Sequence, residues 1–147
     1  EVKNEYIDKC NAYIYENNEQ FKEAAEIFKK YNMDKEFEKC LDNAGCYEDL
    51  VNWYYRKRGK DNDRKYYYYA TKVYDEKLIW DKSALLCWML KNYELSIDRY
   101  MKDYYQEMDA NKKEQKMRKI KNLVNYKIED NDVRMKIISK YPQLSIL

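Results

Sequence analysis

An aromatic residue, a small or aliphatic residue four places later and a second aromatic three places after that recur three times in this chain. The three copies are Phe21/Ala25/Phe28, Tyr47/Val51/Tyr54 and Tyr93/Ile97/Tyr100. Spacings of four and three residues place the members of one copy on one face of an α-helix. Each copy also follows a shorter helical pattern. The sequence therefore predicts three antiparallel helix pairs.

The scarcity of turn-forming residues supports a helical fold. The 147 residues include two Gly (Gly45 and Gly59) and one Pro (Pro142), whereas sandwiches and barrels need many such residues for their turns. The 18 Tyr, three Phe and three Trp supply enough large rings for a core although 38% of the residues are charged. We expect an all-α fold of antiparallel helix pairs stacked as a short irregular α-solenoid. A compact helical bundle is the alternative.

The periodic pattern divides the chain into two parts. Residues 6–105 are predicted to form three degenerate helix pairs, and residues 110–147 a basic helix followed by a C-terminal helix. In the second part a helical stripe of apolar residues continues through the basic run; it comprises Met117, Ile120, Val124 and Ile128. We expect residues 1–147 to form a single helical domain. Because the chain begins at Glu1, we expect it to be a segment of a longer protein.

Local signals predict further details of the helices. The first helix is expected to turn four residues inward, namely Tyr6, Cys10, Tyr13 and Ile14. Gly45 is a natural left-handed residue after a helix end. Asp81 or Ser83 is expected to cap one helix, and the segment 130–132 to cap the last one.

The segment from Ala84 to Tyr100 resembles a tetratricopeptide-type helix pair. In that family a small residue of the first helix meets a small residue of the second, and aromatic residues wedge between them. Ala84 and Ser96 take the small positions here, and Tyr93 and Tyr100 the aromatic ones. The first unit matches in the same way, with Ala12 and Ala24 small and Phe21 and Phe28 aromatic.

The second unit departs from this pattern, because Glu38 and Leu50 occupy its small positions. The units start 26 and then 46 residues apart, whereas the family has a regular period of about 34 residues. Such uneven pairs are similar to the α-solenoids of vesicle-coat, tethering and ciliary-transport subunits. The resemblance implies a platform whose extended surface binds other proteins.

The composition disfavours several other functions. The net charge is only +2, so nothing draws the whole chain toward nucleic acid or a membrane surface. No apolar run approaches the roughly 18–20 residues of a membrane span. The heavy use of Lys, Asn, Tyr and Ile matches the codons of an AT-rich genome.

The four cysteines and the absence of histidine bear on metal binding, on the cellular compartment of the protein and on catalysis. The four cysteines form no Cys-x-x-Cys pair and no histidine is present, so we expect no metal site and no cofactor. Cys40 and Cys87 fall on apolar helix faces, which favours reduced core thiols in a cytoplasmic protein; disulfides in a secreted protein are the alternative. Without histidine or a Gly-rich phosphate loop, we expect no enzymatic activity and no catalytic residues.

Two surface regions are candidate interfaces. The first combines aromatic residues outside the repeated pattern with nearby cations, and it comprises Trp53, Tyr55, Arg56, Arg58, Tyr67 and Tyr68. Exposed large aromatics often anchor protein interfaces, although packing against the next helix pair is an equal alternative for Trp53. The second is a patch for an acidic partner, formed by Lys112, Lys113, Lys116 and Lys119. The apolar stripe embedded in this run favours the charged face of a core helix, and an acidic partner or a lipid headgroup is the alternative.

These observations lead to one expected function and one alternative. We expect a non-catalytic scaffold for protein–protein interaction within a larger coat, tethering or transport assembly. The alternative is a secreted or exported helical domain that binds a host or receptor protein.

Overall fold

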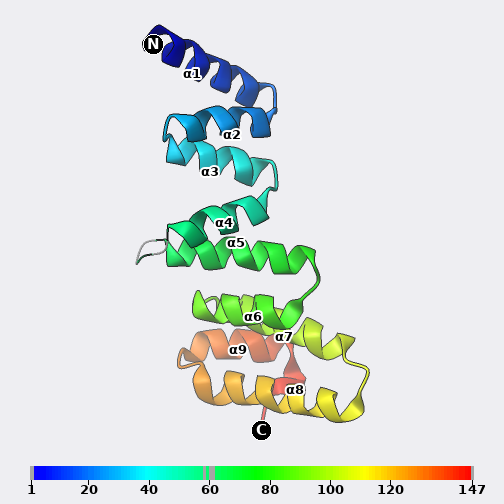
Figure 1. Cartoon of the computed structure of the whole chain (residues 1–147). Helices are drawn as coiled ribbons and strands as arrows, with labels where there is room; N and C mark the ends of the chain where they lie inside the picture. Colours follow the sequence, from blue (N-terminus) through cyan, green and yellow to red (C-terminus); the bar gives the residue numbers. More distant parts are fainter. Residues whose placement is uncertain (1, 58, 60–61, 147) are drawn as a thin grey trace. The chain divides into compact units, whose positions relative to one another are not determined.

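The computed structural model describes residues 2–57, 59 and 62–146, and every regular element within these ranges is a helix (Figure 1). The predicted all-α class is thereby confirmed. The chain divides into two compact units, Glu1–Asn62 and Asp63–Leu147. That residues 1–147 form a single domain remains a prediction.

The first unit is a series of antiparallel layers. It contains α1 (Val2–Asn17), α2 (Phe21–Lys30), α3 (Asp34–Asn43) and α4 (Tyr47–Arg56). Each helix packs against the next, and successive helices alternate in direction (Figure 1). The helices α2 and α4 therefore run in the same direction on either side of α3.

The second unit begins with three helices in the same succession, α5 (Asp63–Glu76), α6 (Trp80–Met89) and α7 (Tyr93–Gln106). The helix α7 then packs against both α8 (Ala110–Asn122) and α9 (Asn131–Lys140). A π-helical segment, Leu123–Lys127, continues α8, and a 3₁₀ turn, Pro142–Leu144, follows α9. The predicted stripe of the basic helix is confirmed, because Ile120, Val124 and Ile128 are all buried in the core of this unit.

Five of the connections between helices have the same backbone geometry. In each, the residue two places after the helix end has a positive φ, between 57° and 72°; these residues are Glu19, Asn32, Gly45, Leu78 and Lys91. The amide that follows each of them donates to a carbonyl five residues back, as Gln20 does to Tyr15 at 2.8 Å and Asn92 to Cys87 at 2.9 Å. This is the Schellman motif, which satisfies the last carbonyls of a helix. Its recurrence explains the regular alternation of α1–α4 and of α5–α7.

Buried small residues lie at the helix contacts where the sequence places them. Ala12 and Ala24 are fully buried, and so are Ala84 and Ser96. The Ser96 hydroxyl donates to the carbonyl of Ala84 at 2.7 Å, which joins α6 directly to α7. In the second predicted unit a different contact is made, because the Tyr54 hydroxyl donates to the Glu38 carboxylate at 2.5 Å.

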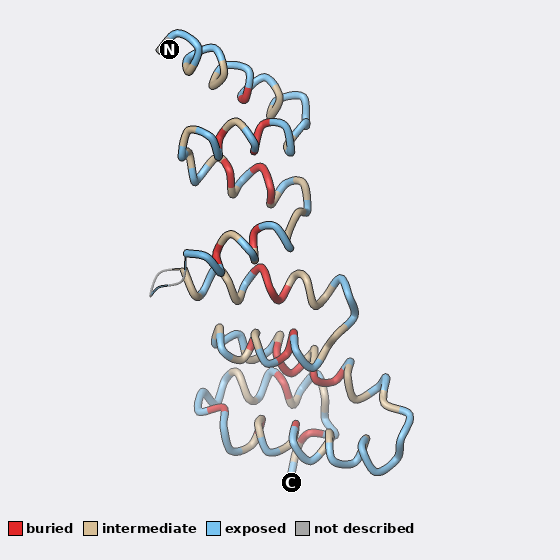
Figure 2. Tube along the Cα trace, viewed as in Figure 1, coloured by how far each residue is buried: buried red, intermediate tan, exposed pale blue. Residues whose placement is uncertain are grey.

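The orientation predicted for the first helix is wrong. Tyr6, Cys10, Tyr13 and Ile14 are exposed, and Tyr6 keeps 70% of its surface. The helix packs mainly against α2, and the residue it buries there is Ala12. In Figure 2 most of α1 is correspondingly exposed or half-buried. The apolar residues at positions 6, 10, 13 and 14 share a face that stays largely exposed, although its Tyr13 ring contacts Phe28 of α2 with centroids 5.2 Å apart.

One predicted cap is also wrong and another is confirmed. The helix α6 begins at Trp80 with Ile79 as its N-cap, and the buried Ser83 hydroxyl donates to Asp75 at 2.5 Å instead. At α9 the Asp130 side chain accepts from the amides of Asp132 and Val133, as expected for an acidic N-cap.

Candidate functional site

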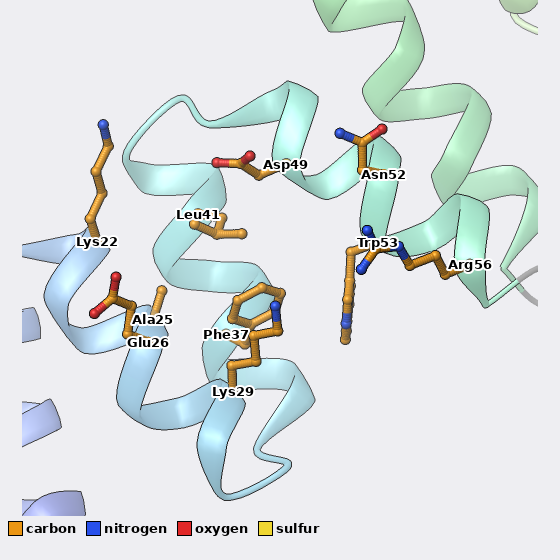
Figure 3. A pocket seen from close by; sticks show the side chains of 10 residues that line it. All are labelled: Lys22, Ala25, Glu26, Lys29, Phe37, Leu41, Asp49, Asn52, Trp53 and Arg56. Carbon is orange, nitrogen blue, oxygen red and sulfur yellow. The ribbon is translucent and has the colours of Figure 1, made fainter.

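A groove of about 340 Å³ lies across three consecutive helices of the first unit (Figure 3). We call it the α2–α4 groove. Its walls are Lys22, Ala25, Glu26 and Lys29 of α2 and Asp49, Asn52, Trp53 and Arg56 of α4; its floor is Phe37 and Leu41 of α3. The volume is at the lower end of the range for small-molecule sites, so it has room for one or two large side chains.

The helical period explains why these ten residues meet. The four wall residues of α2 stand at positions i, i+3, i+4 and i+7, and so do the four of α4. Residues with this spacing share one helix face. Because two successive Schellman turns bring the chain back to the same direction, these faces of α2 and α4 flank the same side of α3.

The apolar part of the groove is centred on two rings. Phe37 is buried, and its ring meets the half-buried Trp53 in an edge-to-face pair with centroids 4.9 Å apart. The ammonium of Lys57 lies 4.0 Å from the Trp53 ring centroid and pairs with Asp34 at 2.9 Å. These contacts hold the indole in place, so little side-chain entropy remains to be lost when a partner binds.

The helix α4 is also joined to α3 by a hydrogen bond. Tyr54, the neighbour of Trp53, is buried and donates to Glu38 of α3. Burial, followed by this hydrogen bond, raises the pKa of Tyr54, so its hydroxyl remains a donor across the physiological range. Deeper in the unit, burial and the hydrogen bond to Glu16 raise the pKa of the Cys40 thiol to about 12. Both groups therefore stay neutral within the core.

The rim of the groove is charged. Lys22, Glu26, Lys29, Asp49 and Arg56 are all exposed, and Asn52 adds an uncharged polar side chain. Among the ion pairs formed by the described residues, none involves these five side chains. A mostly apolar floor with a rim of unpaired charges is the arrangement found where one protein binds a segment of another.

The structure brings together part of the first predicted interface. Trp53 and Arg56 both line the α2–α4 groove. Tyr55 is 54% exposed but is not among the lining residues, and Arg58 lies outside the described residues. Tyr67 and Tyr68 belong to α5, in the other unit.

The tyrosines of α5 divide as the helical period requires. Tyr69 is buried, Tyr67 is half-buried and Tyr68 is 46% exposed. The four consecutive tyrosines, residues 66–69, therefore do not all face the core. The ammonium of Lys72 lies 5.2 Å from the centroid of the Tyr68 ring.

The predicted acidic-partner patch is largely engaged within the second unit. Lys116 pairs with Asp103 and with Glu107, each at 3.1 Å. The hydrogen bond from Lys116 is the main cause that lowers the pKa of Glu107. The ammonium groups of Lys113 and Lys119 lie 4.8 Å from the ring of Tyr104 and 4.7 Å from that of Tyr100. Lys112 is exposed.

Sequence reasoning missed most of the groove, including Lys22, Glu26, Lys29, Asp49 and Asn52. The available signal was the shared i, i+3, i+4, i+7 spacing in two helices that flank a third. This spacing becomes informative once it is known that two Schellman turns make α2 and α4 run in the same direction.

Within the described part of the chain, no helix has the length and apolar character of a membrane span. No known protein family, no curated protein and no solved structure matches the chain.

Proposed function

We propose that this chain is a non-catalytic scaffold that binds a segment of another protein in the α2–α4 groove. The observation that carries the proposal is the fixed Phe37–Trp53 pair beside a rim of unpaired charges. Large aromatic side chains in preorganised, partly desolvated sites commonly dominate the energy of protein interfaces. The layered helices of the first unit provide the rigid support that such a site needs.

The resemblance to tetratricopeptide-type pairs supports the same function. Buried small residues meet at Ala84 and Ser96, and Ala12 and Ala24 are fully buried, as this architecture requires. Helical-repeat proteins use the surfaces of stacked helices to contact partners. We therefore propose that the chain works within a larger cytoplasmic assembly of the coat, tethering or transport type.

Affinity capture from the source cells, read by quantitative mass spectrometry, tests this function. The bait is the full chain, compared with Trp53→Ala, which removes the aromatic wall, and Asn52→Arg, which places a long cation over the groove. The matched control is Gln115→Arg, an equally exposed polar position on α8.

We expect the same partner proteins to be lost with both groove variants and retained with Gln115→Arg. Circular dichroism melts establish that the variants are folded. Partners that bind the wild type and both groove variants equally would place the interface elsewhere. Testing Tyr55→Ala in the same series would show whether the exposed side of α4 is used instead.

A further inference from the structure

The charges of the α2–α4 groove are distributed unequally between its two ends. Lys29 and Arg56 stand in the last turns of α2 and α4 and line opposite walls of the groove, with the rings of Phe37 and Trp53 between them in Figure 3. At the other end Lys22 of α2 lies opposite Asp49 of α4. One end is therefore purely cationic, whereas the other is mixed.

Among the described residues the two cations have no acidic partner, unlike their sequence neighbours. Lys30 pairs with Asp8 at 3.5 Å, and Lys57 pairs with Asp34 at 2.9 Å. In the described part of the chain, neither Lys29 nor Arg56 forms an ion pair. The Lys29 ammonium instead lies 5.9 Å from the Phe37 ring centroid, over the floor of the groove.

Cations in the last turn of a helix also interact favourably with its dipole. That effect accounts for basic residues at these helix ends in general, since Lys30 and Lys57 share it. It does not account for two unpaired cations on opposite walls of one apolar groove.

We infer that the groove selects a protein segment with a large apolar side chain for the Phe37–Trp53 seat and an Asp or Glu for Lys29 and Arg56. This inference rests on the proposed function and names the chemistry of the partner. A carboxylate between an ammonium and a guanidinium, next to a water-excluding pair of rings, forms charge-assisted hydrogen bonds. Because the seat adjoins the cationic end, the acidic residue lies within about one helical turn, three or four residues, of the apolar anchor.

The charge distribution also sets which end of the bound segment lies at which end of the groove. An acidic residue at the Lys29–Arg56 end places the other end of the segment over Lys22, Glu26 and Asp49. A basic residue is favoured there by the two carboxylates and opposed by one lysine. The favoured order along the partner is acidic, apolar, then neutral or basic.

A phage library of 15-residue peptides, selected on the full chain and counter-selected on Trp53→Ala, tests the inference. Selected peptides are synthesised, labelled and titrated by fluorescence anisotropy. We expect Asp or Glu within four residues of a large apolar residue in these peptides. Lys29→Glu and Arg56→Glu should each weaken binding about tenfold, because each reversal replaces an attraction between the exposed rim and the acidic residue by a repulsion. Lys112→Glu, an exposed reversal on α8, should change the affinity less than twofold.

A charge exchange completes the test. Peptides in which the acidic residue is replaced by Lys should bind the double variant Lys29→Glu/Arg56→Glu more tightly than the wild type. The inference would be overturned, and the proposed function would stand, in either of two cases. In the first, peptides whose binding depends on Trp53 contain no acidic residue. In the second, their affinity is unchanged by Lys29→Glu and by Arg56→Glu. If no peptide depends on Trp53 or is blocked by Asn52→Arg, both the inference and the proposed groove are rejected.

Discussion

Leu78 holds a backbone conformation that is unfavourable for a residue with a branched side chain. Its φ is 59°, and its side chain is 59% exposed, so packing recovers little of the cost. A left-handed conformation costs roughly 1–2 kcal/mol in an L-residue, and glycine avoids that cost but loses about 0.5–1 kcal/mol of chain entropy. We therefore expect Leu78→Gly to raise the free energy of unfolding by about 0.5–1 kcal/mol, measured by urea denaturation.

The matched control is Leu85→Gly, at an exposed position inside α6. There the same substitution should destabilise the protein by about 1 kcal/mol, because glycine is unfavourable in a helix interior. Destabilisation by both variants would show that Leu78 does not occupy the Schellman position in solution.

Ser96 illustrates a second constraint at the residue scale, which is size. Its fully buried side chain donates to the Ala84 carbonyl, and α6 and α7 approach closely at this point. We expect Ser96→Ala to cost about 0.5–1.5 kcal/mol for the lost hydrogen bond, and Ser96→Leu about 1–3 kcal/mol or more for overpacking. Thermal and urea unfolding measure both values. Ser139→Leu, at an exposed position of α9, should have little effect.

The cysteine thiols should differ sharply in reactivity. Burial raises the pKa of Cys40 from an ordinary value near 9 to about 12, and burial also raises that of Cys87. Since the thiolate is the reactive form, iodoacetamide at pH 8 should modify the exposed Cys10 and spare Cys40 and Cys87 until urea is added. Mass spectrometry of digests reads the result, and rapid labelling of Cys40 in the folded protein would contradict it.

The Cys40 thiol also makes a pH-dependent contribution to the stability of the fold. Because the pKa of Cys40 is higher in the folded state, its contribution is fully present below pH 9 and is lost as the pH rises toward 12. Cys40→Ala should therefore flatten the decline of stability in this interval.

At the scale of the helix, the sequence predicted which residues share a helix face more reliably than which neighbouring helix covers that face. The stripes of α2, α7 and α8 bury Phe28, Ile97 and Ile120, because each of these helices contacts neighbours on its apolar face. The helix α1 has a comparable apolar face that α2 leaves largely exposed. A period of 3.6 identifies residues that share a face but not the neighbour that meets it. The groove escaped prediction for the related reason that it combines three helices through two turns, of which only the one at Gly45 carries a glycine.

The attachment of α1 leads to an element-scale prediction. The helix packs mainly against α2 and buries Ala12 completely at that contact. Ala12→Leu should detach α1 while α2–α4 remain folded, because a larger side chain has no space there. Hydrogen exchange read by mass spectrometry should show lost protection in residues 2–17 and retained protection in residues 34–56. Ala110→Leu, at the exposed start of α8, is the control, and loss of protection throughout residues 2–56 would contradict the prediction.

Three helices of the second unit are joined by one polar cluster. Asp75 of α5 accepts two hydrogen bonds from Arg99 of α7, at 2.9 and 3.1 Å, and one from Ser83 of α6. A lysine cannot reproduce the two-pronged geometry of a guanidinium. Arg99→Lys should therefore cost about 1–2 kcal/mol in urea denaturation, whereas the exposed pair partner Arg118→Lys should cost almost nothing. Equal effects of the two substitutions would show that the cluster adds no more than a surface ion pair.

For the whole molecule, the division into two compact units matters more for experiment than the number of repeats. The second unit encloses a continuous core that includes Ile97, Met101, Ile120, Val124 and Leu144, contributed by α7, α8, the π-helical segment and the C-terminal 3₁₀ turn. The first unit is a single succession of layers, so each of its helices has neighbours on at most two sides. Its smaller size and its fewer mutual contacts predict a lower free energy of unfolding for the first unit.

Fragments that separate the units test this difference. The boundary between Asn62 and Asp63 cuts no helix, because α4 ends at Arg56 and α5 begins at Asp63. We expect residues 63–147 to fold alone, with a sigmoidal urea transition followed by circular dichroism and with dispersed methyl resonances from the buried core. Residues 1–62 should unfold at a lower urea concentration and with a shallower slope, because less surface is buried on folding. A fragment 63–147 that unfolds gradually and binds hydrophobic dye, although the full chain unfolds cooperatively, would mean that its core is completed by the other unit. The free energy of folding would then belong to the chain as a whole, and peptide binding to the α2–α4 groove would have to be measured on the full chain alone.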